Sequence, residues 1–288
     1  GVENRYLNKE IKKVVPFHPI GSGMLAAPFV FIGNSIQKIS NNDGLISFVY
    51  FMYSIAPIFY LLISILLIQK SMKVLNIRYN RNLLLIAIFG TGISYYSFDR
   101  FSMSHIYEFF GTSFLIYLSA YSLEKKNSSR IVYINFLIGF LMFFFLAIRW
   151  TNYLFFIIPM IIYLISKSSV KNLYLHPSFI FGGLLGLSIF LLHTKYLYGI
   201  YTLNQAPIVL SVENSFSANY TRFFDLNMFS ENIVFVFEGL RIILFSQEFG
   251  LFYFAPILFL SFVFTMISIY EKKYSLGFCL LILYTIPF

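Results

Sequence analysis

Cysteine and charged residues are both scarce in this sequence, and each shortage excludes a class of protein. The single cysteine, Cys279, excludes an internal disulfide framework and any zinc or redox motif built from several cysteines. Only 11% of the 288 residues are charged, whereas 58% are hydrophobic, and the mean hydropathy is +0.75. Water-soluble domains do not have this composition, so the sequence predicts a multi-pass membrane protein.

The sequence also lacks a recognisable signal peptide, because its first 13 residues are polar and no uninterrupted apolar core follows them. Residue 1 is glycine, and the apolar run that ends at Phe288 is shorter than the roughly 20 residues of a spanning helix. We therefore expect the chain to be an excerpt of a longer protein, truncated at both ends.

Apolar runs separated by charged residues predict a bundle of transmembrane helices. Several runs are shorter than about 20 residues and would need a thinned bilayer or an extension into their flanks. A break at Arg149 keeps every later basic linker on one side of the membrane, and the alternative is one long helix over 131–166. The expected spans are 45–69, 83–98, 106–123, 131–148, 150–166, 179–198 and 251–270, with another that begins at 275.

Basic residues gather on one side of this predicted bundle. Alternating crossings put the linkers 70–82, 124–130, 167–178 and 271–274 on one face, and these linkers hold eleven of the 21 Lys and Arg residues. Because Lys and Arg mark cytoplasmic loops, this face is predicted to be cytoplasmic. The net charge of +9 then reflects topology and not nucleic-acid binding. Ten of the 12 acidic residues fall on the outer side, where either long polar loops or carboxylate chemistry accounts for them.

Four regions follow from this arrangement. We expect an outer loop with a juxtamembrane helix (1–44), a transmembrane bundle (45–198), an outer loop (199–250) and C-terminal transmembrane helices (251–288). In the first region a helix should start near Pro19 or Ile20, because proline is tolerated in a first turn. Its free N–H groups suit an anion such as phosphate. We favour a short helix on the outer surface, and a spanning helix over 19–36 is the alternative.

Four stretches of the sequence resemble, in the same order, motifs of the GT-C type membrane glycosyltransferases, the group that contains protein O-mannosyltransferases and the lipid A aminoarabinose transferase. The resemblance runs over most of the chain and implies an all-α polytopic bundle with short outer-surface helices. The first helix of the family and the loop with its essential Asp or Glu would lie mostly upstream of Gly1. The four stretches are "FHPIGSGMLAAPF" (17–29), "FDRFSMSHIYEFF" (98–110), "LAIRWTNYLFFIIP" (146–159) and "LFSQEFGLFYFAPILF" (244–259).

The resemblance implies transfer of a sugar from a polyprenyl-phosphate carrier to an acceptor glycan, lipid or protein by direct displacement. A carboxylate takes the acceptor proton, and cations or N–H donors stabilise the departing lipid phosphate. This implies a bacterial cytoplasmic membrane with the site on its periplasmic side, and membrane lipids as the other partners. No cofactor is assigned, and a divalent metal stays open. The alternative functions are a flippase or transporter of lipid-linked sugars and a polysaccharide polymerase or ligase.

Glu108 and His105 are the candidate catalytic residues, because with Thr112 they form one polar stripe on an apolar predicted helix. Ionisable groups at membrane depth are costly and usually face a bundle interior or a watery cavity. Two alternatives stay open. One is a His–Glu metal pair, for which no third ligand stands at a convincing spacing. The other is a structural ion pair between Glu108 and Arg149 or Arg100.

The candidate substrate-binding residues carry charged or amide groups near the outer helix ends. A guanidinium at Arg149 can hold a phosphate in a bidentate way, and its alternative role is to snorkel to lipid headgroups. Glu3 and Glu10, two acids of the first outer segment, are further candidates for the base. The substrate-binding candidates are Arg149, Arg100, His18, Asn152 and Glu248.

Overall fold

The structure is a computed structural model that describes residues 7–8, 13–14, 20–40, 47–125, 128–149, 152 and 155–203, together with positions 263, 266, 267 and 270. This part of the chain is mostly helical, which confirms that expectation, and the two-residue strands β1 (Leu7–Asn8) and β2 (Lys13–Val14) pair antiparallel. The helices are α1 (Gly21–Ser40), α2 (Phe48–Val74), α3 (Arg81–Phe89), α4 (Ile93–Phe98), α5 (His105–Glu124), α6 (Ile131–Phe144), the 3₁₀ helix η2 (Phe145–Ala147), α7 (Ile157–Ile165), α8 (Lys171–Tyr174) and α9 (Pro177–Tyr198).

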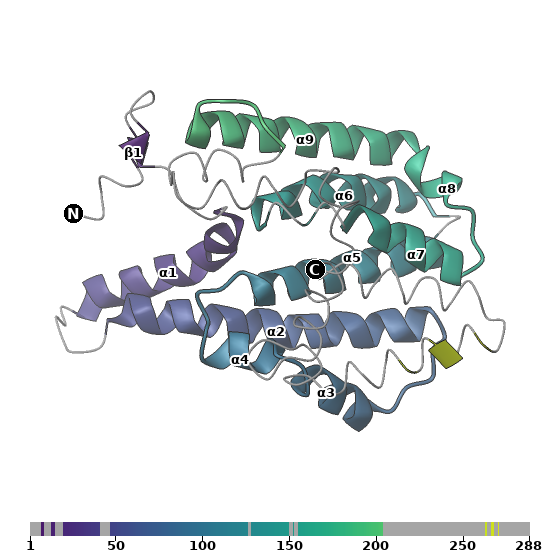
Figure 1. The fold of residues 1–288 in the computed structure, drawn as a ribbon, viewed down its shortest axis with the longest axis horizontal. Coiled ribbons are helices and arrows are strands. Elements are labelled where there is room, and N and C mark those ends of the chain that lie inside the picture. Colours follow the sequence, from purple (N-terminus) through teal and green to yellow (C-terminus); the bar gives the residue numbers. More distant parts are fainter. Residues whose placement is uncertain are drawn as a thin grey trace, which may run out of the picture.

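The long helices run back and forth between two ends of one bundle (Figure 1). The hydroxyls of Ser122 and Tyr163 are 2.8 Å apart and join the last turns of α5 and α7. At the opposite end, the rings of Tyr60 in α2 and Tyr107 in the first turn of α5 pack with their centroids 5.4 Å apart. The described residues of the linkers 70–82, 124–130 and 167–178 lie at one end of the bundle, as the alternating crossings predict (Figure 1); residues 271–274 lie outside the described residues.

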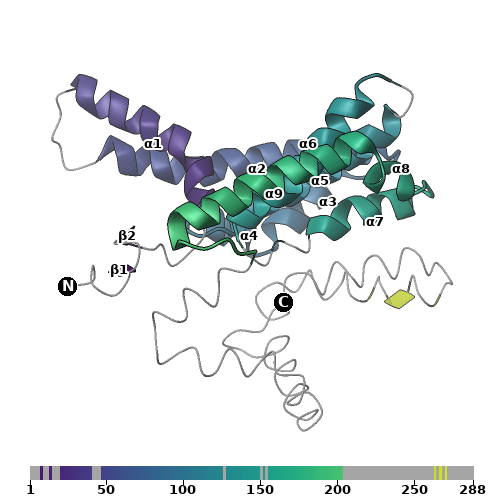
Figure 2. The ribbon, with the colours of Figure 1, turned by 90° about the horizontal axis from the view of Figure 1, so that it is seen from above.

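Helix α1 and the first half of α2 form a hairpin that extends beyond the rest of the bundle (Figure 2). The helix begins at Gly21, next to the expected start at Pro19 or Ile20, and it contains Pro28. Pro28 has no N–H to donate to the preceding turn, which weakens the helix there. The Tyr60 hydroxyl donates a hydrogen bond to the carbonyl of Leu25 (2.9 Å) in this turn, so α2 holds α1 in place.

Helices α6 and α9 run parallel and make the closest helix contact among the described residues. A Cβ atom on Gly186 would lie 2.6 Å from the carbonyl oxygen of Phe140, and one on Gly182 would overlap the carbonyl of Phe136. Gly139 on α6 packs in the same way against the backbone of α9. Gly182 and Gly186 form a GxxxG pattern, which lets helix backbones approach closely in membranes.

The expected helix over 83–98 is wrong in one respect, because the structure divides it into α3 and α4. The break falls at residues 90–92, where Gly90 ends α3 and Gly92 precedes α4. Glycine weakens a helix interior through its backbone entropy. The hydroxyl of Thr91 donates a hydrogen bond to the carbonyl of Ile88 (2.6 Å). In a continuous helix this carbonyl would instead accept a hydrogen bond from a backbone N–H one turn later.

The expected break near Arg149 is confirmed. Helix α6 passes into η2, which ends at Ala147, and α7 begins at Ile157, so a single helix over 131–166 is excluded. Helix α7 starts seven residues later than the expected span at 150. Arg149, two residues after η2, therefore lies at the same end of the bundle as the start of α5.

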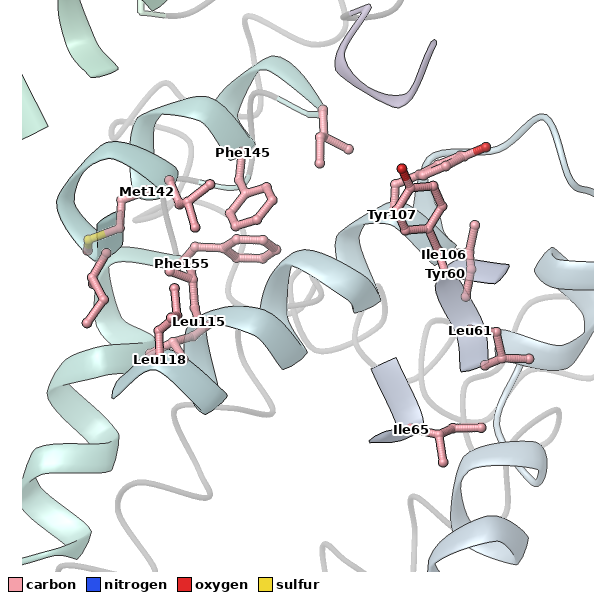
Figure 3. Close-up of a cluster of buried hydrophobic side chains, with 14 of the residues drawn as sticks. Tyr60, Leu61, Ile65, Ile106, Tyr107, Leu115, Leu118, Met142, Phe145 and Phe155 are labelled. Carbon is pink, nitrogen blue, oxygen red and sulfur yellow. The ribbon is translucent and has the colours of Figure 1, made fainter. Parts of the chain in front are cut away.

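The buried core joins α2, α5, α6 and the turn that follows η2 (Figure 3). One group of side chains contains Tyr60, Leu61 and Ile65 of α2 with Ile106 and Tyr107 of α5. A second group packs the later part of α5 against α6 and the segment before α7, with Leu115, Leu118, Met142, Phe145 and Phe155. Because both groups include residues of α5, this helix is the central element of the bundle.

Two described helices, α2 and α9, are long and apolar enough to cross a membrane, with mean hydropathies of 2.3 and 1.6 in their most apolar stretches. Only 33% of this stretch in α2 and 22% in α9 is buried inside the structure. Most residues of these two stretches are therefore not buried inside the described structure.

Candidate functional site

Glu108 lies in the first turn of α5, where it is held by neighbouring polar groups. The hydroxyl of Ser104, the N-cap residue, donates a hydrogen bond to Glu108 Oε1 (2.7 Å). His105 Nδ1 is 3.7 Å from Glu108 Oε2. An acidic side chain at this position is favoured by the helix dipole. The Glu108 side chain is only 18% exposed, so these contacts replace most of its contact with solvent.

Arg149 approaches the same carboxylate from the turn after η2. Its Nη1 is 3.6 Å from Glu108 Oε2, and its side chain is 42% exposed. Of the two ion pairs that the sequence left open for Glu108, the structure has the one with Arg149. We call Ser104, His105, Glu108 and Arg149 the Glu108 cluster; it unites both candidate catalytic residues with the first substrate-binding candidate.

Asn152 fixes the turn that carries Arg149. Its side-chain nitrogen donates to the carbonyl of Phe145 (2.9 Å), and its backbone N–H donates to the carbonyl of Arg149 (3.0 Å). Asn152 is buried, with 4% exposure. Its amide nitrogen is thus engaged within the fold, and in this structure it positions Arg149, whereas the sequence suggested contact with substrate.

The start of α1 lies against the backbone that precedes Arg149. A Cβ atom on Gly21 would lie 2.5 Å from the backbone nitrogen of Ile148 and would overlap Ala147. Only glycine allows this approach. The first N–H groups of a helix have no partner within it and favour an anion. The two features that the sequence predicts as phosphate ligands, the α1 start and Arg149, are therefore neighbours.

Arg100 lies on the exposed connection between α4 and α5, apart from the carboxylate of Glu108. Its Nε donates to the hydroxyl of Tyr95 (2.9 Å), which raises the pKa of the guanidinium. The neighbouring ring of Tyr96 packs on the His105 ring, with centroids 4.2 Å apart. Arg100 is therefore attached to the segment that supports His105.

Two members of this arrangement were not singled out from the sequence. Ser104 precedes Glu108 by four residues, a spacing at which side chains face each other on a helix, so this signal was present. Tyr96 comes from another helix, and no local pattern connects it with His105. Four of the sequence candidates, His18, Glu3, Glu10 and Glu248, lie outside the described residues.

The charges of the Glu108 cluster define what it can do chemically. A guanidinium beside a helix start attracts an anion, while a carboxylate and an imidazole can accept a proton or bind a hydroxyl. Within the described part of the chain, no three His, Cys, Asp or Glu side chains come together as metal ligands. Comparisons of the chain with protein-family models, with curated proteins and with solved structures found no match.

Proposed function

We propose that this protein is a multi-pass membrane glycosyltransferase that moves a sugar from a polyprenyl-phosphate carrier to an acceptor on the outer side of a bacterial cytoplasmic membrane. The observation that carries the proposal is a meeting of three segments. His105 and Arg149 both lie close to the carboxylate of Glu108, and the backbone just before Arg149 contacts Gly21 at the start of α1. These groups come from three of the four stretches that resemble GT-C type enzymes, and they meet at one end of the bundle.

The outward-facing side chains of α9 support the membrane part of the proposal. Contiguous apolar patches larger than a few hundred Å² are rare on proteins in water. Burying such side chains in lipid contributes about 25 cal/mol for each Å² removed from water. The exposed apolar residues of α9 include Ile180, Phe181, Leu184, Leu185, Ile189 and Leu192.

The sidedness rests on the distribution of charge. The described residues of the linkers 70–82, 124–130 and 167–178 share the end of the bundle that is rich in Lys and Arg, and by the positive-inside rule this end is cytoplasmic. The Glu108 cluster is at the other end and therefore faces outward. A polyprenyl-linked donor would present its phosphate and sugar at that level of the membrane.

In the proposed reaction the acceptor hydroxyl or amine attacks C1 of the sugar. The bond between C1 and the phosphate oxygen breaks, and the polyprenyl phosphate leaves with the bonding electrons. Arg149 and the first N–H groups of α1 stabilise the charge on this leaving group. The acceptor loses its proton to a carboxylate or imidazole, and Glu108 and His105 are the described groups that can take it. The contact with Glu108 also orients the guanidinium of Arg149.

The test measures release of polyprenyl phosphate from a radiolabelled polyprenyl-phosphate sugar by membranes that contain the protein. We expect Arg149→Ala and Glu108→Ala each to lower the rate at least about 100-fold, since each removes charge stabilisation or positioning at the reacting phosphate. Lys38→Ala, at the far end of α1, is the matched control and should leave the rate unchanged. Wild-type rates in both cluster variants, with normal membrane insertion, would refute this assignment. A flippase would move the carrier without cleaving it, so the same assay separates that alternative.

A further inference from the structure

Eight basic side chains among the described residues surround the end of the bundle opposite the Glu108 cluster. They belong to the end of α2, the segment up to the start of α3, the connection between α5 and α6, and the connection between α7 and α9 (Figure 1). All except Lys125 are exposed. We call them the basic end: Lys70, Lys73, Arg78, Arg81, Lys125, Arg130, Lys167 and Lys171.

These cations have almost no counter-charge in the described part of the protein. Lys125 contacts the carboxylate of its neighbour Glu124 (2.6 Å), and no other member of the basic end forms an ion pair with a described residue. The hydroxyl contact between Ser122 and Tyr163 brings the ends of α5 and α7 together, and with them Lys125 and Lys167. Gathered cations repel one another, so this arrangement favours an anionic partner.

Exposed apolar side chains accompany the cations on the same helix faces. Leu66 precedes Lys70 by one turn of α2, and Tyr133 follows Arg130 by one turn of α6, and both Leu66 and Tyr133 are exposed. Residues three or four positions apart share a helix face. Each pair therefore presents a cation at the end of the bundle and an apolar side chain further along it. A phospholipid has the same order, with a charged headgroup above an apolar chain.

We propose that the basic end binds the headgroups of anionic phospholipids in the cytoplasmic leaflet, with phosphatidylglycerol as the representative chemistry. The cations contact the phosphate, and the apolar side chains one turn away contact the acyl chains. This inference rests on the membrane embedding within the proposed function and is independent of sugar transfer.

The test is equilibrium binding of fluorescent phosphatidylglycerol and phosphatidylcholine to the purified chain in a non-ionic detergent. We expect tighter binding of phosphatidylglycerol and a preference that shrinks as salt is raised. Lys125→Gln with Lys167→Gln should weaken phosphatidylglycerol binding roughly fivefold for each charge removed. The control removes two exposed cations elsewhere, Lys38→Gln with Lys195→Gln, and should change binding less than about twofold.

Equal weakening by the two double variants, or equal binding of the two lipids by the unaltered chain, would overturn the proposal. If Lys125→Gln with Lys167→Gln loses helicity by circular dichroism, the pair Lys70→Gln with Lys73→Gln on α2 serves as the test with the same expected loss. Glycerol 3-phosphate should not displace the lipid, and displacement by it would point to a soluble phosphate instead. Because no donor sugar is used, failure of the glycosyltransferase proposal would leave these outcomes unchanged.

Discussion

The two ends of the bundle carry charge in opposite ways. In the Glu108 cluster, charges of both signs contact one another, and Glu108 is largely buried. At the basic end every cation except Lys125 is exposed, and only Lys125 contacts a described carboxylate. Groups that contact one another fix one another's geometry, as a reaction centre requires. Exposed cations can change their side-chain conformation, so they can contact any of the many identical headgroups of a lipid surface. The comparison predicts that the Glu108 side is sensitive to small structural changes and that the basic end is tolerant of them.

The largest expected effect comes from Gly21→Ala. Its methyl group would overlap the backbone of Ala147 and Ile148, so either α1 or the turn before Arg149 must move. Overpacking of this kind costs about 1–3 kcal/mol. Gly23→Ala is the matched control two residues away, because a Cβ there meets nothing within 4 Å. Helix propensity makes it neutral or stabilising by up to about 1 kcal/mol. Unfolding in mixed micelles measures the stability of both variants. An equal loss of stability in Gly21→Ala and Gly23→Ala would contradict the close contact at Gly21.

Arg149→Ala should come next, because it leaves Glu108 without its guanidinium partner. The cost should be about 1–2 kcal/mol, below that of a fully buried pair because Arg149 is partly exposed to solvent. The double variant Glu108→Gln with Arg149→Ala should cost less than the sum of the single variants Glu108→Gln and Arg149→Ala, with a coupling of about 1 kcal/mol. Additive single effects in this unfolding cycle would mean that the two side chains do not interact.

Tyr60→Phe should have a smaller effect, because it removes only the hydrogen bond to the carbonyl of Leu25 and keeps the ring. One hydrogen bond of this kind contributes about 0.5–1.5 kcal/mol. The loss should appear in the unfolding midpoint and in faster proteolysis of α1. No change in either measurement would show that Tyr60 does not hold this helix.

The smallest effect is expected at the basic end. Lys70→Gln with Lys73→Gln removes two exposed cations that have no partner among the described residues, so the unfolding midpoint in a neutral detergent should shift by less than about 2 °C. In micelles that contain phosphatidylglycerol the unaltered chain should gain stability over the variant, since a ligand stabilises the state that binds it. A large loss in neutral detergent would mean that these side chains support the fold itself.

The sequence was most informative where local chemistry decides the structure. Prolines near the start of α1 and the charge of Arg149 marked two helix ends correctly, because both signals act within one or two turns. The break at residues 90–92 was missed, since the surrounding run is continuously apolar and glycine alone does not end a helix. In this case Thr91 provides the hydrogen bond that completes the break.

The site itself was predictable only in part. The sequence supplied Glu108, His105 and Arg149 as candidates, but spacing could not decide whether Glu108 pairs with Arg149 or Arg100. That choice depends on which connection between helices lies over the start of α5, which is a matter of tertiary packing. The contact of Gly21 with Ile148 joins segments far apart in the chain, and nothing near either residue indicates it.

The parallel glycine contact between α6 and α9 has a consequence for biogenesis. Gly139 is made well before Gly182 and Gly186, and α7 must be completed between them. At a synthesis rate of about 5–20 residues per second, the glycines of α9 are made roughly 2–9 s after Gly139 of α6. During this interval the glycine face of α6 is uncovered and available to a chaperone, the insertion machinery or another nascent helix. Formation of the contact between α6 and α9 is therefore a step at which assembly can be delayed or misdirected.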